Sequence, residues 1–309
     1  MPLHPRMQEV LDAYARAGGA PVHELTPAEA RRKYAADPDL AGPPEPVARV
    51  WDGEIDGPGG SLPVRFYVPE LDSPAPVLVY FHGGGWVCGG IRYVDPPLRS
   101  IVNRARCAAV SVDYRLAPEH EFPAAAEDAY AAVSWVAERA TELGFDSDRV
   151  AVGGDSAGGN LATVAALMAR DRGGPRLAYQ VLVYPVTDHD FDTASYVQNA
   201  EGFLLTRDSM KWYWGHYLAD ERDGANPYAS PLRADVTGLP PALMITAEHD
   251  PLRDEGDAYA HRLEAAGVPV RLRCLEGLVH GFFRMGDALE EAQEALDDIA
   301  DTLRGVFYP

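Results

Sequence analysis

The sequence predicts an α/β fold with a mostly parallel sheet of eight strands and helices on both faces of the sheet. Short apolar runs alternate with helix-forming stretches through most of the chain, and this order is typical of βαβ units. Several of the runs are uninterrupted and rich in valine, as expected of strands that helices cover on both faces. A chain of 309 residues can bury a substantial core, and α/β proteins of this length often form one domain.

The expected strands and helices follow one another along the chain. Strands are expected over residues 47–51, 64–68, 77–81, 108–113, 150–153, 180–184, 242–247 and 270–275. Helices are expected over residues 95–104, 123–143, 157–170, 254–266 and 286–303. Because no helix separates the first two strands, they predict an antiparallel lead-in to the parallel part of the sheet. Active sites of doubly wound sheets lie outside the carboxyl ends of the strands, so candidate catalytic residues are sought there.

Two regions interrupt this alternation and predict a helical cap. Residues 1–45 hold two expected helices and a proline-rich turn segment, 36–46, and residues 189–225 carry a cluster of large aromatic side chains. The rings could be ordinary core, but they follow the carboxyl end of a strand, where a lid would be inserted. We therefore expect cap helices in 1–45 and a cap insertion at 189–225, with the core divided between 46–188 and 226–309.

Composition limits the partners that this chain can bind. The formal net charge of −20 at pH 7 argues against nucleic acid and acidic membrane surfaces, and it disfavours a strongly anionic substrate. No run of about 18 apolar residues occurs, so no membrane span is expected. The first residues lack the apolar centre of a secretion signal, and we expect a cytoplasmic protein. Cys88, Cys107 and Cys274 are widely spaced and form no metal-binding motif, so neither a metal nor a disulfide is expected.

The motif Gly154-Asp155-Ser156-Ala157-Gly158 lies between an apolar run and a helix-forming stretch. A serine at a sharp strand-to-helix turn projects its hydroxyl out of the backbone, and the glycines allow close backbone packing. By itself the pentapeptide is a weak signal, because glycine and serine are common residues. Its context predicts that Ser156 is a nucleophile, which needs an adjacent base and a group that orients the base.

Candidates for the base and for the orienting acid follow later strands. His280 comes directly after the last expected strand and before the final helix, at the catalytic edge of the sheet. Asp250 follows the strand at 242–247 and is the expected acid. His249 is the alternative base, because it stands beside Asp250, and Glu248 could accept a hydrogen bond near the acid.

The run His82-Gly83-Gly84-Gly85-Trp86 follows the strand at 77–81 and predicts an oxyanion hole. Consecutive glycines expose backbone N–H groups and let a carbonyl oxygen come close. A phosphate-binding loop is the alternative, but the lysine and the Ser/Thr of a P-loop are missing. We expect the N–H groups of Gly83 and Gly84, joined by that of Ala157, to stabilise a developing alkoxide.

The motifs HGGGW, DYRLAPEHEFPAAAEDA, GDSAGGNLA, HDPLRDEG and HGF together resemble the bacterial hormone-sensitive-lipase-type esterases of the α/β-hydrolase superfamily. The chain order Ser156, Asp250, His280 agrees with that superfamily. The resemblance covers about residues 75–285 and implies an α/β-hydrolase fold with a helical cap. It also implies hydrolysis of carboxylic esters of short to medium acyl chain through an acyl-enzyme, with no metal or cofactor.

The resemblance implies further roles away from the reacting atoms. Asp113, Arg115 and Glu119 are expected in a structural network beneath the oxyanion loop. Family members often dimerise through the last strand, here 270–275, and a nearby helix. A small-molecule ester and a second copy of the chain are therefore the expected partners.

Residues of the substrate pocket are harder to separate from core residues. We expect Trp86, Tyr184, Phe203 and Leu204 to line acyl or alcohol pockets, although each could equally be core. Two alternatives to ester hydrolysis remain on the same fold: amide or formamide hydrolysis, and ligand binding without catalysis. The second is disfavoured, because hormone receptors of this fold have lost the catalytic histidine, whereas His280 is present.

Overall fold

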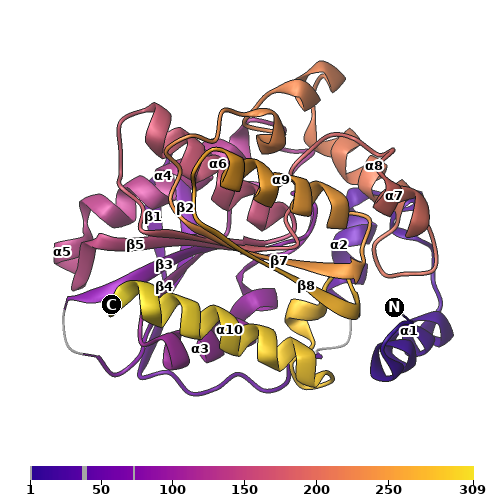
Figure 1. The fold of residues 1–309 in the computed structure, drawn as a ribbon, viewed down its shortest axis with the longest axis horizontal. Coiled ribbons are helices and arrows are strands. Elements are labelled where there is room, and N and C mark those ends of the chain that lie inside the picture. The colour runs from indigo at the N-terminus through magenta and orange to yellow at the C-terminus, as the bar shows by residue number, and fades with distance from the viewer. Residues whose placement is uncertain (1, 37–39, 72–73) are drawn as a thin grey trace.

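The computed structural model of the chain describes residues 2–36, 40–71 and 74–309, through which one eight-stranded sheet runs (Figure 1). The strand order is β1-β2-β4-β3-β5-β6-β7-β8. The β1–β2 and β2–β4 pairs are antiparallel and the other neighbours are parallel, which confirms the predicted fold with its antiparallel lead-in. The strands are β1 (Arg49–Gly57), β2 (Gly60–Val68), β3 (Ala75–Phe81), β4 (Ala108–Val112), β5 (Phe145–Asp155), β6 (Tyr179–Val183), β7 (Ala242–His249) and β8 (Val270–Val279).

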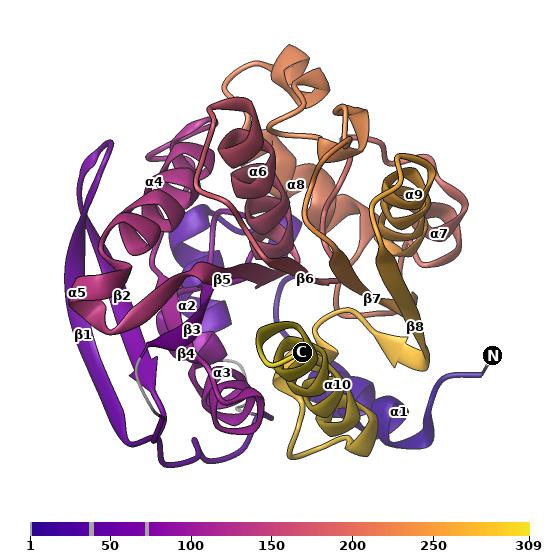
Figure 2. The ribbon, with the colours of Figure 1, turned by 60° about the vertical axis from the view of Figure 1, so that its left-hand side comes forward.

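Helices cover both faces of the sheet, as Figure 2 shows. One face carries α4 (Ala124–Glu138), α6 (Ala157–Asp171) and α9 (Arg253–Ala265), and the other carries α3 (Ile91–Ala105) and α10 (Glu290–Phe307). The remaining helices are α1 (Pro5–Ala17), α2 (Pro27–Ala36), α5 (Ala140–Leu143), α7 (Ala194–Gln198) and α8 (Arg207–Tyr217), with 3-10 turns at Val22–Glu24, Glu221–Ala225, Pro231–Arg233 and Phe282–Arg284. Within the described ranges, no helix combines the length and the apolar character that a membrane crossing requires.

Strand β3 explains why the central strands are apolar without interruption. All of its residues are buried. Its alternate side chains pack into two core layers, because successive residues of a strand point to opposite faces. Val77 and Val79 contact the layer that includes α4 and α6, whereas Leu78 and Tyr80 contact the layer that includes α3 and α10. A strand between two helix layers therefore has no face left for polar side chains.

Several boundaries differ from those expected. Helix α3 begins at Ile91, before the expected start at 95, and it keeps two prolines inside it although proline lacks the N–H of a helical hydrogen bond. The helix expected over 123–143 is broken at Arg139, whose backbone leaves the helical region at φ −101° and ψ 10°. β1 and β2 are longer than expected because they pair with each other along their full length. The turn segment expected at 36–46 includes 37–39, which lie outside the described residues.

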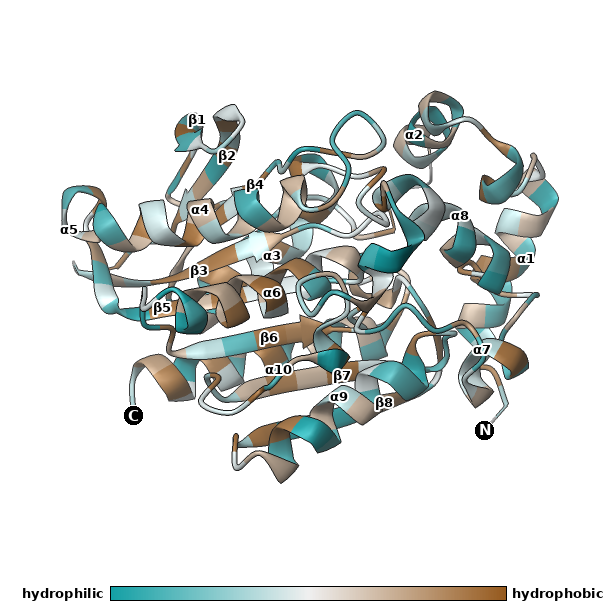
Figure 3. Ribbon diagram, turned by 90° about the horizontal axis from the view of Figure 1, so that it is seen from above, coloured by the Kyte–Doolittle hydropathy of each residue, from teal (hydrophilic) through white to brown (hydrophobic). Residues whose placement is uncertain are grey.

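The N-terminal helices and the 189–225 segment lie at the same end of the sheet. Helices α1, α2, α7 and α8 gather at the end toward which β7 and β8 point (Figures 1 and 3). The two regions also touch, because Trp212 Nε1 in α8 donates to Leu25 O at 3.1 Å. The segments that interrupt the strand–helix alternation therefore lie over the sheet edge where the sequence places the candidate site.

Arg31 of α2 ties the N-terminal region to the loops that follow β3 and β4. Its Nε donates to Val87 O at 2.8 Å, and its Nη2 donates to Ala117 O at 2.8 Å. The guanidinium also binds both carboxylate oxygens of Glu119, at 2.8 and 2.6 Å. These hydrogen bonds from Arg31 lower the pKa of Glu119 to about 2. Arg31 thus connects three separate segments beside the glycine run.

Replacement of Arg31 by alanine is expected to loosen this attachment in a pH-dependent way. Because the pKa of Glu119 is lower in the folded chain than its ordinary 4.5, the ion pair stabilises the fold above that pH. This contribution is lost as the pH falls toward the folded-state value of about 2. We expect Arg31→Ala to lower the Tm by about 2–4 °C at neutral pH.

Thermal melts of the wild type and Arg31→Ala from neutral pH to about pH 3 measure this difference. Arg32→Ala is the matched control, because its exposed side chain lies on the same helix. The difference in Tm between the wild type and the variant should become smaller in acid for Arg31→Ala but not for Arg32→Ala. A gap that stays constant down to about pH 3 would contradict the ion-pair account.

Candidate active site

Ser156 occupies a sharp turn between two elements. β5 ends at Asp155 and α6 begins at Ala157, so Ser156 has φ 58° and ψ −121°. A non-glycine residue in such a backbone region costs roughly 1–3 kcal/mol and persists only where its surroundings enforce it. A Cβ on Gly158 would lie 2.0 Å from the backbone of β3, and one on Gly154 would lie 2.2 Å from the Gly158 carbonyl. The turn therefore requires glycine two residues before and two residues after the serine.

Three residues expected at the site meet at this turn. His280 Nε2 lies 3.0 Å from Ser156 Oγ, and His280 Nδ1 lies 2.7 Å from Asp250 Oδ2. They come from the ends of β5, β7 and β8. The Asp250 side chain is fully buried and that of His280 is 12% exposed. Because the Asp250 carboxylate can only accept, Nδ1 carries the proton and Nε2 is left to accept the Ser156 hydroxyl proton.

Asp250 is fixed by hydrogen bonds as well as by burial. Its Oδ1 accepts from Leu252 N at 2.9 Å, and its backbone carbonyl accepts from Asn199 Nδ2 at 3.2 Å. Since Oδ2 binds His280, both carboxylate oxygens have partners, which a buried charge requires. Asn199 belongs to the 189–225 segment, and no pattern in the sequence marks it as a neighbour of Asp250.

His249, the alternative base, makes other contacts. Its ring stacks on that of Phe203, with centroids 5.2 Å apart. Its Nε2 lies 4.0 Å from Glu248 Oε2, whereas the contact with Ser156 Oγ belongs to His280. The position beside the Ser156 hydroxyl is therefore occupied by the histidine at the end of β8.

The expected role of Gly83 as an oxyanion donor is wrong. Its N–H donates to Asp155 Oδ1 at 3.0 Å, and an N–H that is bound to a carboxylate is not available to an oxyanion. The reason is the sheet order: β3 and β5 are neighbours, so the residue before Ser156 lies beside the first glycine of the run. The sequence pattern could not reveal this contact between strands.

The next N–H groups of the run are better placed to bind an oxyanion. Among the described residues, the N–H groups of Gly84 and Gly85 donate no hydrogen bond to a backbone carbonyl. A tight turn holds this segment, because Val87 N and Cys88 N both donate to Gly84 O, at 3.2 and 2.8 Å. Ala157 is the first residue of α6, and the first N–H groups of a helix have no partner within it.

Asp155 is a buried carboxyl group at the floor of the site that the sequence pattern does not single out. Its Oδ1 accepts from Tyr80 OH at 3.1 Å as well as from the glycine run. Burial raises the pKa of Asp155, and the nearby charge of Arg284 opposes that rise. The Arg284 guanidinium lies 4.8 Å from the ring centre of Tyr34 and 5.6 Å from that of Tyr93. Rings from α2 and α3 thus lie beside the cation whose charge opposes the rise in the pKa of Asp155.

Trp86 does not line an open pocket, contrary to expectation. Its side chain has no exposed surface, and its ring stacks on that of Tyr217 with centroids 4.1 Å apart. Trp214 lies against the same ring pair, and Tyr196 is also fully buried. For these rings, the alternative of ordinary core is the one that the structure supports. The reason is that α8 packs on the turn that follows the glycine run.

Of the other three residues expected in the pocket, Tyr184 and Phe203 lie against the histidines at the strand ends, and Leu204 follows Phe203 in the chain. The Tyr184 ring is buried, with its centroid 4.3 Å from that of His280. Phe203 is partly buried against His249, and Leu204 is partly buried beside it in the chain. These side chains are candidates for the wall of a substrate pocket.

The residues expected beneath the oxyanion loop have separate partners. Arg115 Nη2 pairs with Asp128 Oδ1 at 2.7 Å. Asp113 Oδ1 lies 3.6 Å from Nε2 of the buried His82, while Glu119 binds the arginine of α2. Each of the three residues therefore contacts a different partner, and these contacts do not link the three to one another.

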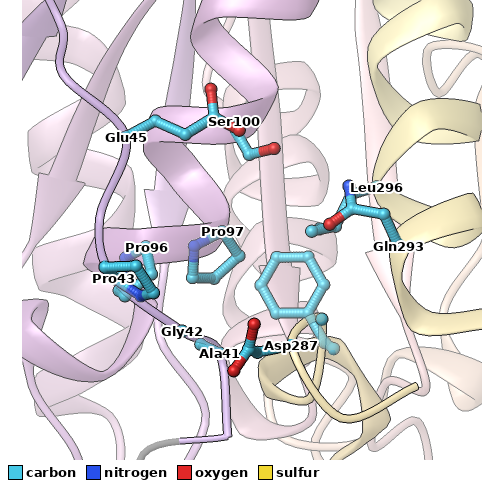
Figure 4. Close-up of a pocket in the computed structure, with 12 residues that line it drawn as sticks. Ala41, Gly42, Pro43, Glu45, Pro96, Pro97, Ser100, Asp287, Gln293 and Leu296 are labelled. Carbon is cyan, nitrogen blue, oxygen red and sulfur yellow. The ribbon is translucent and has the colours of Figure 1, made fainter. Parts of the chain in front are cut away.

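A separate surface pocket lies between residues 41–45, α3 and α10 (Figure 4). Ser100, Asp287 and Gln293 are among the side chains that line it, and no residue of the Ser–His–Asp group does. In the part of the chain that the structure describes, no group of three or more His, Cys, Asp or Glu side chains could hold a metal ion. The three cysteines form no disulfide.

Known proteins are similar to this chain over most of its length. A family model described as alpha/beta hydrolase fold matches residues 78–284. Carboxylesterase NlhH of Mycobacterium tuberculosis is 44% identical over 264 residues, which cover 83% of each chain. Ethyl acetate hydrolase of Pseudomonas putida is 39% identical over 306 residues, or 96% of each chain. The solved structure of a hyperthermophilic esterase from Pyrobaculum calidifontis matches with a TM-score of 0.94 at 42% identity, covering 99% of each chain.

Removal of the Asp155 carboxyl group is expected to displace the glycine run. In Asp155→Ala the buried Tyr80 OH and Gly83 N–H lose their shared acceptor, at about 1–3 kcal/mol for each buried group left unsatisfied. We expect kcat for an activated ester to fall by about tenfold to a hundredfold. Asp155→Asn should retain most activity, because one oxygen can still accept both hydrogen bonds. Steady-state kinetics of both variants, with melting curves, measure this; wild-type kcat in Asp155→Ala would contradict it.

Proposed function

The chain belongs to the α/β-hydrolase fold family, among its hormone-sensitive-lipase-type carboxylesterases, and from this premise we propose that Ser156, His280 and Asp250 are its catalytic triad. Chains of this family hydrolyse carboxylic esters with a serine nucleophile, and so does this one. One observation carries the assignment of residues: the continuous hydrogen-bonded chain from Asp250 Oδ2 through His280 to Ser156 Oγ, with distances of 2.7 and 3.0 Å.

In the proposed reaction, His280 Nε2 takes the hydroxyl proton as Ser156 Oγ attacks the ester carbonyl carbon. Asp250 keeps the histidine in the tautomer with the proton on Nδ1 and stabilises the imidazolium that forms. His280 then returns the proton to the leaving alcohol, and an acyl-enzyme remains. Water repeats the sequence and releases the acid.

We propose that the N–H groups of Gly84, Gly85 and Ala157 hold the oxyanion. Gly85 replaces Gly83 in this set, because the Gly83 N–H is bound by Asp155. Each such donor acts mainly in the transition state, where charge develops on the carbonyl oxygen, and loss of one costs about 3–4 kcal/mol. No metal or cofactor has a part in these steps.

The proposed substrates are esters of small acids, with short to medium acyl chains. This proposal is supported by the low exposure of Ser156, 7%, and by the helices gathered over the site. Tyr184, Phe203 and Leu204 are the proposed pocket walls, since two of them contact the histidines at the strand ends. Amide or formamide hydrolysis is not favoured, because the relatives reported above are esterases.

Two further proposals concern the setting of the enzyme. A homodimer through β8 is supported by the position of β8 at the edge of the sheet, next to α10. Light scattering of the purified chain, compared with a variant carrying proline in β8, tests the dimer.

A cytoplasmic location is supported by three cysteines that form no disulfide, and cell fractionation tests it.

The triad proposal predicts that Ser156→Ala nearly abolishes hydrolysis of an activated short ester. We expect kcat to fall by about a millionfold for Ser156→Ala and about ten-thousandfold for Asp250→Asn, because the nucleophile and the tautomer are lost in turn. Stopped-time assays with p-nitrophenyl butyrate measure both variants. Unchanged hydrolysis in Ser156→Ala would show that another residue is the nucleophile.

The pocket proposal predicts a sharp dependence on acyl length. Rates on p-nitrophenyl esters should fall steeply once the acyl chain exceeds the space under the cap helices, and a matched anilide should react far more slowly than its ester. Phe203→Ala is expected to extend the range of accepted chains. Flat activity on long, emulsified lipids would contradict a closed pocket, and anilide preference would contradict the ester substrate.

A further inference from the structure

We propose that Glu248 is a positioning residue for the triad, because its carboxylate holds a bulge in β8 that brings His280 level with Asp250. The inference deepens the proposed function and rests on the triad assigned there. Glu248 touches none of the reacting atoms. It acts on the two strand ends that carry the base and the acid.

The need for a bulge follows from the pairing of β7 with β8. From Ala242 to Ala247, each β7 residue pairs with a β8 residue 28 positions later, as in Ala242 with Val270. Beyond a register shift, His249 pairs with Val279, which is 30 positions later. The hydrogen bond from His280 to Asp250 has the same separation of 30. β8 therefore contains two extra residues relative to β7 at this point. Without them, residue 278 would lie beside Asp250. With them, His280 lies there.

Hydrogen bonds hold the middle of this bulge through both its N–H and its carbonyl group. Gly277 N donates to Glu248 Oε2 at 2.7 Å, and Gly277 O accepts from His4 N at 2.9 Å. Gly277 has φ +71°, and a Cβ there would lie 2.9 Å from the same His4 N. Only glycine suits this position, where the backbone of the N-terminal segment approaches so closely.

A carboxylate is suited to this task because the bulge removes the regular ladder at this point. A residue added to a strand loses its strand partner, so its N–H needs an acceptor from elsewhere. A hydrogen bond from N–H to an ionised carboxylate is shorter and stronger than one between neutral groups. The Glu248 side chain is 19% exposed, which shields the bond from water.

The backbone of Glu248 is itself anchored by a hydrogen bond. Arg253 Nη1 donates to Glu248 O at 3.0 Å, and Arg253 Nη2 donates to Asp254 Oδ1 at 2.8 Å. Glu248 precedes Asp250 by two residues, and Gly277 precedes His280 by three. One hydrogen bond between Glu248 and Gly277 therefore sets the relative position of both triad partners. A shift of about 1 Å at this point would stretch the bonds on both sides of His280.

The test compares three substitutions of Glu248 in the full chain. Glu248→Ala is expected to lower kcat for p-nitrophenyl butyrate by about tenfold to a hundredfold, with KM changed much less. Glu248→Gln should restore kcat to within a few fold of the wild type, because its amide oxygen can accept from Gly277 N. Glu248→Asp keeps the charge but is one methylene shorter, so its kcat should resemble that of Glu248→Ala.

Glu276→Ala is the matched control. It also removes a carboxylate from this stretch of β8, but the Glu276 side chain is exposed. Melting curves separate lost folding from lost positioning. If Glu248→Ala does not fold, the contrast between the Gln and Asp variants still decides. Wild-type kcat in Glu248→Ala or in Glu248→Asp would overturn the inference, as would a loss in Glu248→Gln equal to that in Glu248→Asp. Ser156→Ala is assayed in parallel: full activity there refutes the triad, whereas its inactivity beside an active Glu248→Ala refutes only the role of Glu248.

Discussion

The hydrogen bond between His280 Nε2 and Ser156 Oγ joins residues 124 positions apart, so only the sheet can fix its 3.0 Å length. Ser156 leaves β5 through a backbone turn that side chains disfavour, and His280 leaves β8 after a bulge. Two strands, β6 and β7, lie between them in the sheet. The packing that sets these two strand ends therefore also sets the distance between Ser156 Oγ and His280 Nε2, the proposed nucleophile and base.

Much of the architecture follows from local patterns. Continuous apolar runs mark strands covered on both faces, and Gly154 and Gly158 mark a turn that requires glycine two residues before and two residues after Ser156. Because carboxyl ends of parallel strands meet at one edge, position selects Asp250 and His280 as candidates, but it leaves His249 as an alternative base, and the family resemblance favours His280. The structure brings the three together as expected.

The remaining features depend on contacts between distant segments. The glycine run predicts Gly83 as an oxyanion donor. The pattern does not show that the Gly83 N–H is bound by Asp155 on the neighbouring strand. From the sequence, Trp86 could be a pocket residue or a core residue. Only its packing against α8 separates the two. Arg31 looks like any helix-surface arginine, yet it joins α2 to two loops. Spacing within a motif cannot report such partners, since they are set by the packing of whole elements.

The most direct measurement is a crystal structure of the chain after reaction with a phosphonate ester, a stable mimic of the tetrahedral intermediate. In the adduct, phosphorus should be bonded to Ser156 Oγ with His280 Nε2 beside the same oxygen, and the phosphoryl oxygen should lie within hydrogen-bonding distance of the N–H groups of Gly84, Gly85 and Ala157. Gly83 N should still bind Asp155. An adduct at another residue, or a phosphoryl oxygen held by Gly83 after that bond has broken, would contradict the proposed triad or oxyanion hole.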